Sequence, residues 1–403
     1  MKKTFARLNS VCERGGKRKM KKLLVAVLAF AMVVCLFAGC SSGNSNEGAG
    51  RIKIGAIGPI TGGAAIYGNA VKNAMEIAVE EVNAKGGIQF ELNFQDDAHD
   101  AETSVNAYGI LMDWGMQMLL GPTTSTPAAA VAAEAEADGV FMLTPSASSI
   151  KVIEGNTHVF QMCFSDPNQG LASADYMADN GIGKAIAVIY KSDDPYSVGI
   201  YEKFSGEAAV KGLNIVYTGS FEEANKTEFS SQLTAAKQAN ADLLFLPIYC
   251  ESIAPLMTQA ASMGYDVDYF GVDGMDGILE VEGFDPSLAE GAYLLTPFSA
   301  DAQDEKTVNF VKAYKEKYNE VPNQFAADAY DCVYAVYEAC NNAGITADMS
   351  AQDVCAALAD QFASGKFVFS GITGNNMTWD STGAVSKSPM AVVIKDGKYV
   401  LAG

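Results

Sequence analysis

Two short loops rich in serine and threonine carry the residues best suited to binding a small charged molecule. The first is GPTTSTP at 121–127, and the second is TPSASS at 144–149. Their hydroxyl groups can donate hydrogen bonds to a carboxylate, and the free N–H groups at a helix N-terminus can do so without arginine or lysine. Such residues also cap helices and satisfy turns, which is their commoner role in isolation. The surrounding sequence has to decide between the two roles.

Each loop follows an apolar segment that predicts a β-strand, MQMLL at 116–120 and VFML at 140–143. An Ala-rich helix is expected between them, with Thr126 as N-cap and Pro127 at the first helical position. A strand–helix–strand unit makes two parallel strands, so both loops should leave the same edge of one sheet. In open α/β sheets, ligands bind at that carboxyl edge.

Strand and helix patterns alternate along the chain from Arg51 to the C-terminus. This order indicates an α/β protein with two successive sheets, and helices late in the sequence imply that the chain crosses between them more than once. Further strands are predicted at 52–57, 90–94, 185–190, 214–218, 242–247, 269–272, 293–296 and 391–394. Further helices are predicted at 197–211, 227–239, 253–263, 304–318, 326–343 and 351–362.

The composition is that of a large acidic globular protein. With 403 residues and 49% apolar content, the chain can bury the cores of two or three domains. Residues 1–39 hold nine of the 28 Lys and Arg and one of the 48 Asp and Glu, which leaves a formal charge of −28 on the remainder. Such a surface repels nucleic acid and anionic lipid head groups, so neither is an expected partner.

The N-terminus has the pattern of a bacterial export signal. A basic cluster at 17–22 precedes an apolar run at 23–38 that is short for a membrane span. The run ends LFAGC, followed by SSGNSNEGAG, and this resembles a lipobox with Cys40 as the lipidated residue, although Phe37 stands where Leu is more usual. We expect 1–39 to be a signal peptide, with Met20 as an alternative start, and 40–50 to be a lipidated cysteine and flexible linker. A plain secretory signal or a membrane anchor is the alternative.

Features of enzymes and metal sites are scarce. His99 and His158 are the only histidines, so a Ser-His-Asp triad or a zinc site has little to draw on. Neither a Walker A loop nor a Rossmann fingerprint occurs, and no cofactor is predicted. The odd number and wide spacing of the remaining cysteines favour small buried side chains over a disulfide framework. These are Cys163, Cys250, Cys332, Cys340 and Cys355.

Six segments, in order, resemble the leucine/isoleucine/valine-binding proteins, which are branched-chain amino-acid receptors of ABC importers. They are GPITGGAAIYGNAVKNAMEIAVEEVNAKGG, QDDAHDA, GPTTST, FMLTPSAS, DPNQG and YFGVDG. The resemblance runs from Arg51 to the C-terminus and implies the type I periplasmic-binding-protein fold. In that fold two Rossmann-like lobes, joined by three crossovers, close on a ligand in the interlobe cleft. The implied crossovers lie near Phe164, Thr296 and Ser386, giving a lobe I of 51–164 plus 297–386 and a lobe II of 165–296 plus 387–403.

The resemblance also implies which residues bind the charged groups of an amino acid. Ser125 and Ser148 match hydroxyls that hold the carboxylate, and Ser146 matches a position whose carbonyl receives the ammonium. Asp273 matches the acidic residue that pairs with the ammonium, although the family member considered carries Glu there, one methylene longer. In isolation, an acid at this position is more often a solvated or capping loop residue.

Three tyrosines match aromatic contacts of the family, namely Tyr67, Tyr196 and Tyr249. We expect them at loop tips on the same edge, where a ring with a polar end can cover an apolar side chain. The neighbouring Asp193 and Asp194 are expected to form a solvated turn. The family member joins the positions of His99 and Thr124 by a disulfide, which this chain cannot form.

The sequence therefore predicts a solute-binding lipoprotein of an ABC importer, not an enzyme, that binds branched-chain or related amino acids by hinge closure. Its expected partners are a small-molecule ligand, an ABC permease and, through the lipid alone, a membrane. We expect a monomer at the cell surface or in the periplasm. The alternatives are a ligand-sensing module of a signalling system, and an importer receptor for an amide, urea or an aromatic acid.

Overall fold

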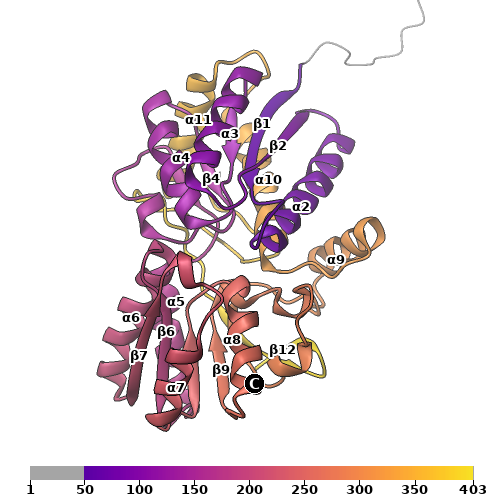
Figure 1. Cartoon of the computed structure of the whole chain (residues 1–403). Coiled ribbons are helices and arrows are strands. Elements are labelled where there is room, and N and C mark those ends of the chain that lie inside the picture. The colour runs from indigo at the N-terminus through magenta and orange to yellow at the C-terminus, as the bar shows by residue number, and fades with distance from the viewer. Residues whose placement is uncertain (1–49, 403) are drawn as a thin grey trace, which may run out of the picture. The chain divides into compact units, whose positions relative to one another are not determined.

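The computed structural model describes residues 50–402, which form two β-sheets covered by helices (Figure 1). The predicted signal peptide and Cys40 lie outside the described residues. In the described part of the chain, no helix combines the length and apolar character needed to cross a bilayer.

The first sheet has five parallel strands in the order β2-β1-β3-β4-β5. These strands are β1 (Ile52–Gly58), β2 (Phe90–Asp96), β3 (Met118–Leu120), β4 (Met142–Thr144) and β5 (Val159–Gln161). Its helices are α2 (Ala65–Ala84), α3 (Ala101–Trp114), α4 (Ser125–Asp138), α9 (Glu305–Tyr318), α10 (Gln324–Ala343) and α11 (Ala351–Ala363). The last three come late in the sequence but belong to this sheet, since α9 and α10 pack against α2 and α11 packs against β3. We call this unit lobe I.

The second sheet has seven strands in the order β12-β11-β10-β9-β8-β6-β7, and only β11 and β12 pair in antiparallel fashion with their neighbours. The strands are β6 (Ile186–Lys191), β7 (Ile215–Phe221), β8 (Leu243–Leu246), β9 (Asp268–Gly271), β10 (Tyr293–Thr296), β11 (Met390–Lys395) and β12 (Lys398–Leu401). The helices are α5 (Asp166–Asn180), α6 (Pro195–Lys211), α7 (Ser230–Gln238) and α8 (Cys250–Ser262). We call this unit lobe II.

The chain passes between the lobes three times: between β5 and α5, between β10 and α9, and before β11. This topology confirms the predicted α/β fold with two lobes and three crossovers. The central strands are mainly apolar because helices cover both faces of a parallel sheet; β3, β4 and β8, for example, are entirely buried.

Close packing of α5 against α6 fixes the entry to lobe II. Gly170 in α5 makes this possible, because a Cβ at that position would lie 2.6 Å from the carbonyl oxygen of Ile200 and 2.7 Å from the backbone nitrogen of Phe204. The two helices therefore approach until backbone meets backbone, which places their first turns side by side.

Three local details differ from the sequence prediction. The N-cap of α4 is Thr124, not Thr126, and the helix begins at Ser125. Pro127 fits inside the first turn because the N–H that proline lacks has no intrahelical acceptor there. Strand β5 and helix α5 were not predicted, since β5 has three residues and α5 buries mainly small or polar side chains such as Gln169 and Ser173.

Candidate functional site

The two hydroxyl-rich loops leave neighbouring parallel strands, as predicted. Leu119 of β3 pairs with Met142 of β4, so both loops start at the same edge of the lobe I sheet. They are tied together there: the Ser146 hydroxyl donates to the Thr123 carbonyl at 2.6 Å, and the Ser149 N–H donates to Ser125 Oγ at 3.2 Å. Ser125 stands in the first turn of α4, where the helix dipole favours negative charge.

Ser148 differs from the other serines of these loops. It is fully buried, and its Oγ has no hydrogen-bond partner among the described residues. An unpaired buried hydroxyl costs about 1–3 kcal/mol, so its presence points to a partner that the protein itself does not supply.

The three predicted tyrosines gather in one aromatic cluster. The ring of Tyr249 stacks on Tyr196 with centroids 4.4 Å apart and lies 5.5 Å from the ring of Tyr67. They do not stand at loop tips: Tyr67 and Tyr196 lie in the first turns of α2 and α6, and Tyr249 is the residue before α8. These helices begin earlier than their apolar periodicity indicates. Helix α6, for example, begins at Pro195.

Asp273 follows β9 in a 3₁₀ turn, Asp273–Met275, and only 4% of it is exposed. Its Oδ1 accepts hydrogen bonds from the Tyr196 hydroxyl at 2.6 Å and from the Gly274 N–H at 2.7 Å. Asp273 therefore caps Gly274, the role expected of an isolated loop acid, but it is also buried. Burial raises its pKa to about 7, against the opposing effect of the hydrogen bond from the Tyr196 hydroxyl.

Lobe I touches this turn directly. The Tyr67 hydroxyl donates to the Gly274 carbonyl at 2.7 Å and accepts from the Cys250 N–H at 2.8 Å. The side chain of Gln324, in α10, donates to the Asp273 carbonyl at 3.3 Å. Residues of both lobes therefore enclose the aromatic cluster and Asp273.

Asp166 completes the site and was missed by the sequence reasoning. It is fully buried, its N–H donates to the Ser148 carbonyl at 3.0 Å, and neither carboxylate oxygen has a hydrogen-bond partner within residues 50–402. Burial raises the pKa of Asp166 well above its usual value, and the nearby charges of Asp273 and Asp194 add to that shift. The DPNQG motif carries the signal, but an acid followed by proline reads as an ordinary helix start.

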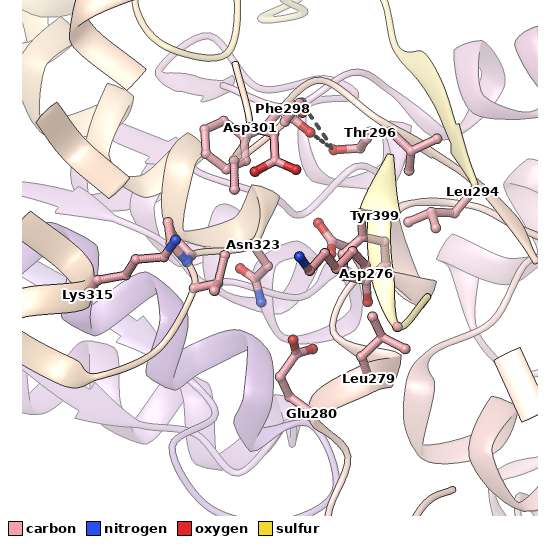
Figure 2. A pocket seen from close by; sticks show the side chains of 17 residues that line it. Asp276, Leu279, Glu280, Leu294, Thr296, Phe298, Asp301, Lys315, Asn323 and Tyr399 are labelled. Carbon is pink, nitrogen blue, oxygen red and sulfur yellow. Dashed lines mark hydrogen bonds between the residues drawn. The ribbon is translucent and has the colours of Figure 1, made fainter. Parts of the chain in front are cut away.

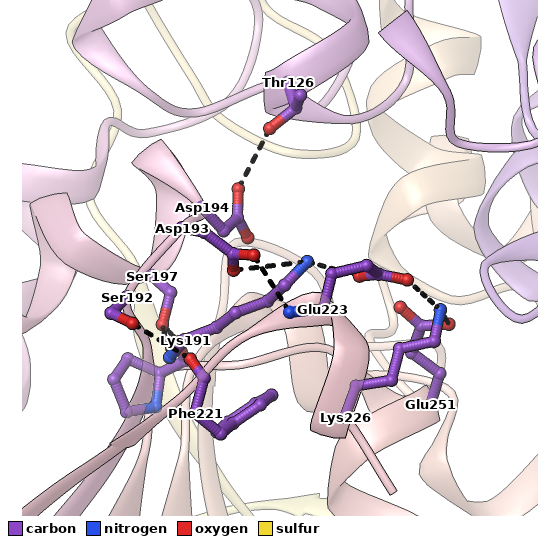
Figure 3. A network of polar contacts seen from close by, with 11 residues as sticks. Thr126, Lys191, Ser192, Asp193, Asp194, Ser197, Phe221, Glu223, Lys226 and Glu251 are labelled. Carbon is purple, nitrogen blue, oxygen red and sulfur yellow. Dashed lines mark hydrogen bonds and ion pairs between the residues drawn. The ribbon is translucent and has the colours of Figure 1, made fainter.

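Asp194 is also buried, and its expected place in a solvated turn is wrong. It is 3% exposed, and its Oδ1 accepts a hydrogen bond from the Thr126 hydroxyl of lobe I at 3.2 Å (Figure 3). The adjacent Asp193 is exposed, as expected. The extended backbone of Asp194 just before α6 turns its side chain toward the start of α4.

His99 and Thr124, the positions of the family's disulfide, are joined here by a hydrogen bond. His99 Nδ1 lies 2.8 Å from Thr124 Oγ1, and the imidazole meets the Tyr249 ring edge-on with centroids 5.5 Å apart. The loop before Ser125 is thus held by polar contact.

All five cysteines predicted to be small buried side chains are buried and unpaired. Nowhere between residues 50 and 402 do three or more His, Cys, Asp or Glu side chains form a group that could hold a metal ion.

A separate cavity of about 220 Å³ lies beside the turn that carries Asp273 (Figure 2). Its wall includes Asp276, Tyr399 and the crossover residue Thr296, and none of the seven predicted site residues lines it. Asp276 Oδ2 accepts from the Gln324 N–H at 2.8 Å, so Gln324 contacts both this wall and Asp273. This cavity is a neighbour of the candidate site.

Comparison with known proteins places this geometry in a family. The model of the periplasmic binding protein family matches residues 51–398. A "Leu/Ile/Val-binding protein homolog 3" of Brucella melitensis is 29% identical, with 94% of this chain and 99% of the relative covered. A leucine-, isoleucine-, valine-, threonine- and alanine-binding protein of Pseudomonas aeruginosa is 26% identical, with 82% and 86% covered.

A solved structure gives the same result. The branched-chain amino-acid transporter substrate-binding protein of Streptococcus pneumoniae, in complex with isoleucine, superimposes with a TM-score of 0.78 at 27% identity. The superposition covers 87% of this chain and 98% of that one. Because the family model spans nearly all of the described residues, the chain belongs to the periplasmic binding protein family, whose members are extracytoplasmic solute-binding proteins with the type I fold.

Proposed function

We propose that this protein binds an amino acid in the cleft between its lobes, as the solute receptor of an ABC importer. The unpartnered polar atoms of the cleft carry this proposal. Neither the Ser148 hydroxyl nor the Asp166 carboxylate has a hydrogen-bond partner within residues 50–402, and the bond from the Asp166 N–H to the Ser148 carbonyl holds the two residues together. A zwitterion satisfies both, since its carboxylate needs donors and its ammonium needs acceptors.

The two charges of the ligand have distinct binding places in this proposal. The carboxylate lies at the start of α4, where it accepts hydrogen bonds from Ser125, Ser148 and nearby N–H groups. The ammonium lies between Asp166 and Asp273, with the Ser146 carbonyl as a third acceptor. The names of the relatives support branched-chain amino acids or chemically related ones as the ligand class.

The tyrosines of both lobes stabilise the closed arrangement of the lobes around the ligand. Tyr196 and Tyr249 of lobe II stack on each other, and Tyr67 of lobe I bonds to the Gly274 carbonyl. A ligand buried under these rings favours the closed state, because the contacts on its two sides exist together only when the lobes meet. The closed form then docks on a permease.

The buried acids argue against an aromatic acid as the ligand. A benzoate-like molecule has no cation, so Asp166 and Asp273 stay unpaired beside a further negative charge. Urea and simple amides offer donors but no charge to compensate these carboxylates.

We further propose that 1–39 are removed as a signal peptide and that lipidated Cys40 anchors the protein as a monomer outside the cell membrane. The lobe bounds 51–164 plus 297–386 and 165–296 plus 387–403 belong to the same proposal. The change of sheet after β5, after β10 and before β11 supports them.

Calorimetric titration of the mature protein, residue 40 onward, tests the ligand class. We expect one or more of the twenty amino acids to bind, and the matching 2-keto acids, which lack the ammonium, to bind at least about tenfold more weakly. Benzoate and urea serve as controls and should give no heat of binding. Equal affinity for an amino acid and its keto analogue would contradict the proposal.

A further inference from the structure

Asp194 is a buried acid that the proposed contacts with the ligand's carboxylate and ammonium do not use. Its Oδ1 is engaged by the Thr126 hydroxyl at 3.2 Å. Its Oδ2 is buried and has no hydrogen-bond partner, and Asp194 takes part in no ion pair, among residues 50–402. A carboxylate held in this way is costly unless a donor or cation joins it.

Burial raises the pKa of Asp194, and the charge of Lys191, which is drawn near it in Figure 3, opposes this shift without cancelling it. Lys191 is paired with Glu223 at 2.6 Å, and Lys226 is paired with both Glu223 and Glu251. With Asp193 and Asp194 included, two lysines face four carboxylates in this network. Burial lowers the pKa of His99, which disfavours a charged imidazole beside Asp194.

The position of Asp194 relative to the proposed ligand follows from its contacts. Thr126 is next to Ser125, the proposed carboxylate contact, while His99 packs edge-on against Tyr249 and bonds to Thr124. Burial raises the pKa of Tyr249, and the charge of Asp194 raises it further. His99, Tyr249 and Asp194 are therefore joined by contacts to the residues on either side of Ser125, the proposed carboxylate contact.

We propose that the ligand of this protein is a basic amino acid whose side-chain cation pairs with Asp194. The inference rests on the proposed function as an amino-acid receptor, and it replaces the branched-chain class suggested by the relatives' names with a basic one. Three buried carboxylates, Asp166, Asp194 and Asp273, are 0%, 3% and 4% exposed. A branched-chain ligand brings one ammonium, which Asp166 and Asp273 share, and it leaves Asp194 desolvated against an apolar side chain.

The competing role for Asp194 is purely structural. Its bond to Thr126 links lobe II to lobe I, and a link of this kind supports closure on any ligand. The two roles differ in what they do to selectivity: a structural link affects all ligands alike, whereas a cation partner affects only ligands with a side-chain cation.

Matched ligand pairs separate these roles in calorimetric titrations of the mature protein. The pairs are lysine with norleucine, ornithine with norvaline, and arginine with citrulline, which differ in the side-chain cation. In at least one pair we expect the cationic member to bind about ten- to a hundredfold more tightly, the range for a hydrogen bond to a charged group. Leucine, isoleucine or valine binding as tightly as every cationic ligand would overturn the inference while leaving the proposed function intact. Failure of every amino acid to bind would overturn both.

Two substitutions and a control complete the test. Asp194→Asn should reduce the preference for the cationic member to less than about threefold while changing norleucine affinity by less than about threefold. Thr126→Val removes the link but keeps the carboxylate, so it should weaken both members of a pair equally and preserve the preference. Asp193→Asn is the matched control, since Asp193 is in the same turn with 41% of its side chain exposed, and it should change nothing. Equal weakening of both members by Asp194→Asn, with thermal melting unchanged, assigns the structural role and overturns the inference.

Discussion

Individual side chains of the candidate site are distinguished by the hydrogen-bond partners that they lack. Nine buried side-chain atoms within the described residues have no hydrogen-bond partner, and five of them belong to Ser148, Asp166, Gln169 and Asp194. All four belong to the loop after β4 or to the starts of α5 and α6. Because buried polar groups in native proteins are normally paired, a cluster of exceptions marks the place where a ligand completes the structure.

Replacing Ser125 by alanine tests the carboxylate contact. The substitution removes one hydrogen bond to a charged group, so we expect ligand affinity to fall by about 1.5–3 kcal/mol, or roughly ten- to a hundredfold. It also leaves the Ser149 N–H without its acceptor, and this should lower the free energy of unfolding by about 1 kcal/mol. Calorimetry and urea unfolding measure the two effects separately. Unchanged affinity would place the ligand's anion elsewhere.

Ligand binding should strengthen with rising pH because of Asp273. Its pKa is about 7 in the unliganded protein, so at pH 5.5 the carboxyl is protonated and must release a proton to pair with an ammonium. Affinity should therefore rise from pH 5.5 to 8, by up to about tenfold per unit below pH 7. Titrations in buffers of different ionisation enthalpy should show proton release, and Asp273→Asn should reduce it. A pH-independent affinity would contradict the role of Asp273.

Without ligand, the raised pKa of Asp273 makes the stability of the fold decrease with rising pH, whereas ligand affinity increases. The folded protein holds the Asp273 proton between the ordinary value of 3.8 and about 7, whereas the unfolded chain has lost it. The contribution of Asp273 to the free energy of unfolding therefore falls as pH rises through this window. Asp273→Asn should raise the melting temperature of the unliganded protein at pH 8 relative to wild type, while affinity for the ligand falls.

At the scale of elements, the site is built from helix starts. Ser125 and Tyr196 lie in the first turns of α4 and α6, Asp166 is the first residue of α5, and Tyr249 immediately precedes α8. In both lobes these starts follow the carboxyl ends of parallel strands, where free N–H groups and short connecting loops can approach a ligand. The positions of the site residues relative to one another therefore depend on how closely neighbouring helices pack.

Gly170→Ala tests this dependence in α5. The added methyl group would meet the backbone of α6 at 2.6–2.7 Å, so α5 has to move, and we expect a loss of about 1–3 kcal/mol in the free energy of unfolding. Because Asp166 moves with the helix, affinity should fall as well.

The matched control is Gly206→Ala, in α6. A Cβ at Gly206 meets no atom within 4 Å, so alanine should stabilise the helix by up to about 1 kcal/mol and leave affinity unchanged. Urea unfolding and calorimetry compare the two variants. Similar effects on stability would show that the contact between α5 and α6 is not close in solution.

At the scale of the whole molecule, the two lobes are joined by polar contacts on both sides of the aromatic cluster. Tyr67 bonds to the Gly274 carbonyl on one side, and Thr126 bonds to Asp194 on the other. At the crossover before β11, Lys387 and Asp328 form a fully buried ion pair at 2.6 Å. These contacts join segments far apart in the sequence, so closure is a property of the complete chain.

Attachment to a membrane is a property of the whole molecule that the N-terminal sequence predicts. Cys40→Ala removes the sulfur that would carry the lipid, so the protein should be released into the soluble fraction or accumulate as unprocessed precursor. Membrane fractionation with mass determination measures both outcomes. A processed Cys40→Ala protein that still fractionates with membranes would refute the lipoprotein proposal.

The sequence by itself determined the alternation of strands and helices, the adjacency of the two hydroxyl-rich loops and the family. Local patterns suffice for these features, since apolar periodicity reports which face of an element is buried, and a strand–helix–strand unit implies a parallel pair. The sequence also brought Asp273 into consideration, through its position after the strand that became β9.

Only the tertiary structure decided which polar residues are buried. Asp193 and Asp194 are adjacent, and no local pattern separates them, yet one is exposed while the other is buried against Thr126, 68 residues away in the sequence. Asp166 is likewise indistinguishable from a capping residue until Ser148 and Asp273 close around it. The physical reason is that desolvation of a charge comes from segments brought together by folding, and periodicity along one segment carries no record of them.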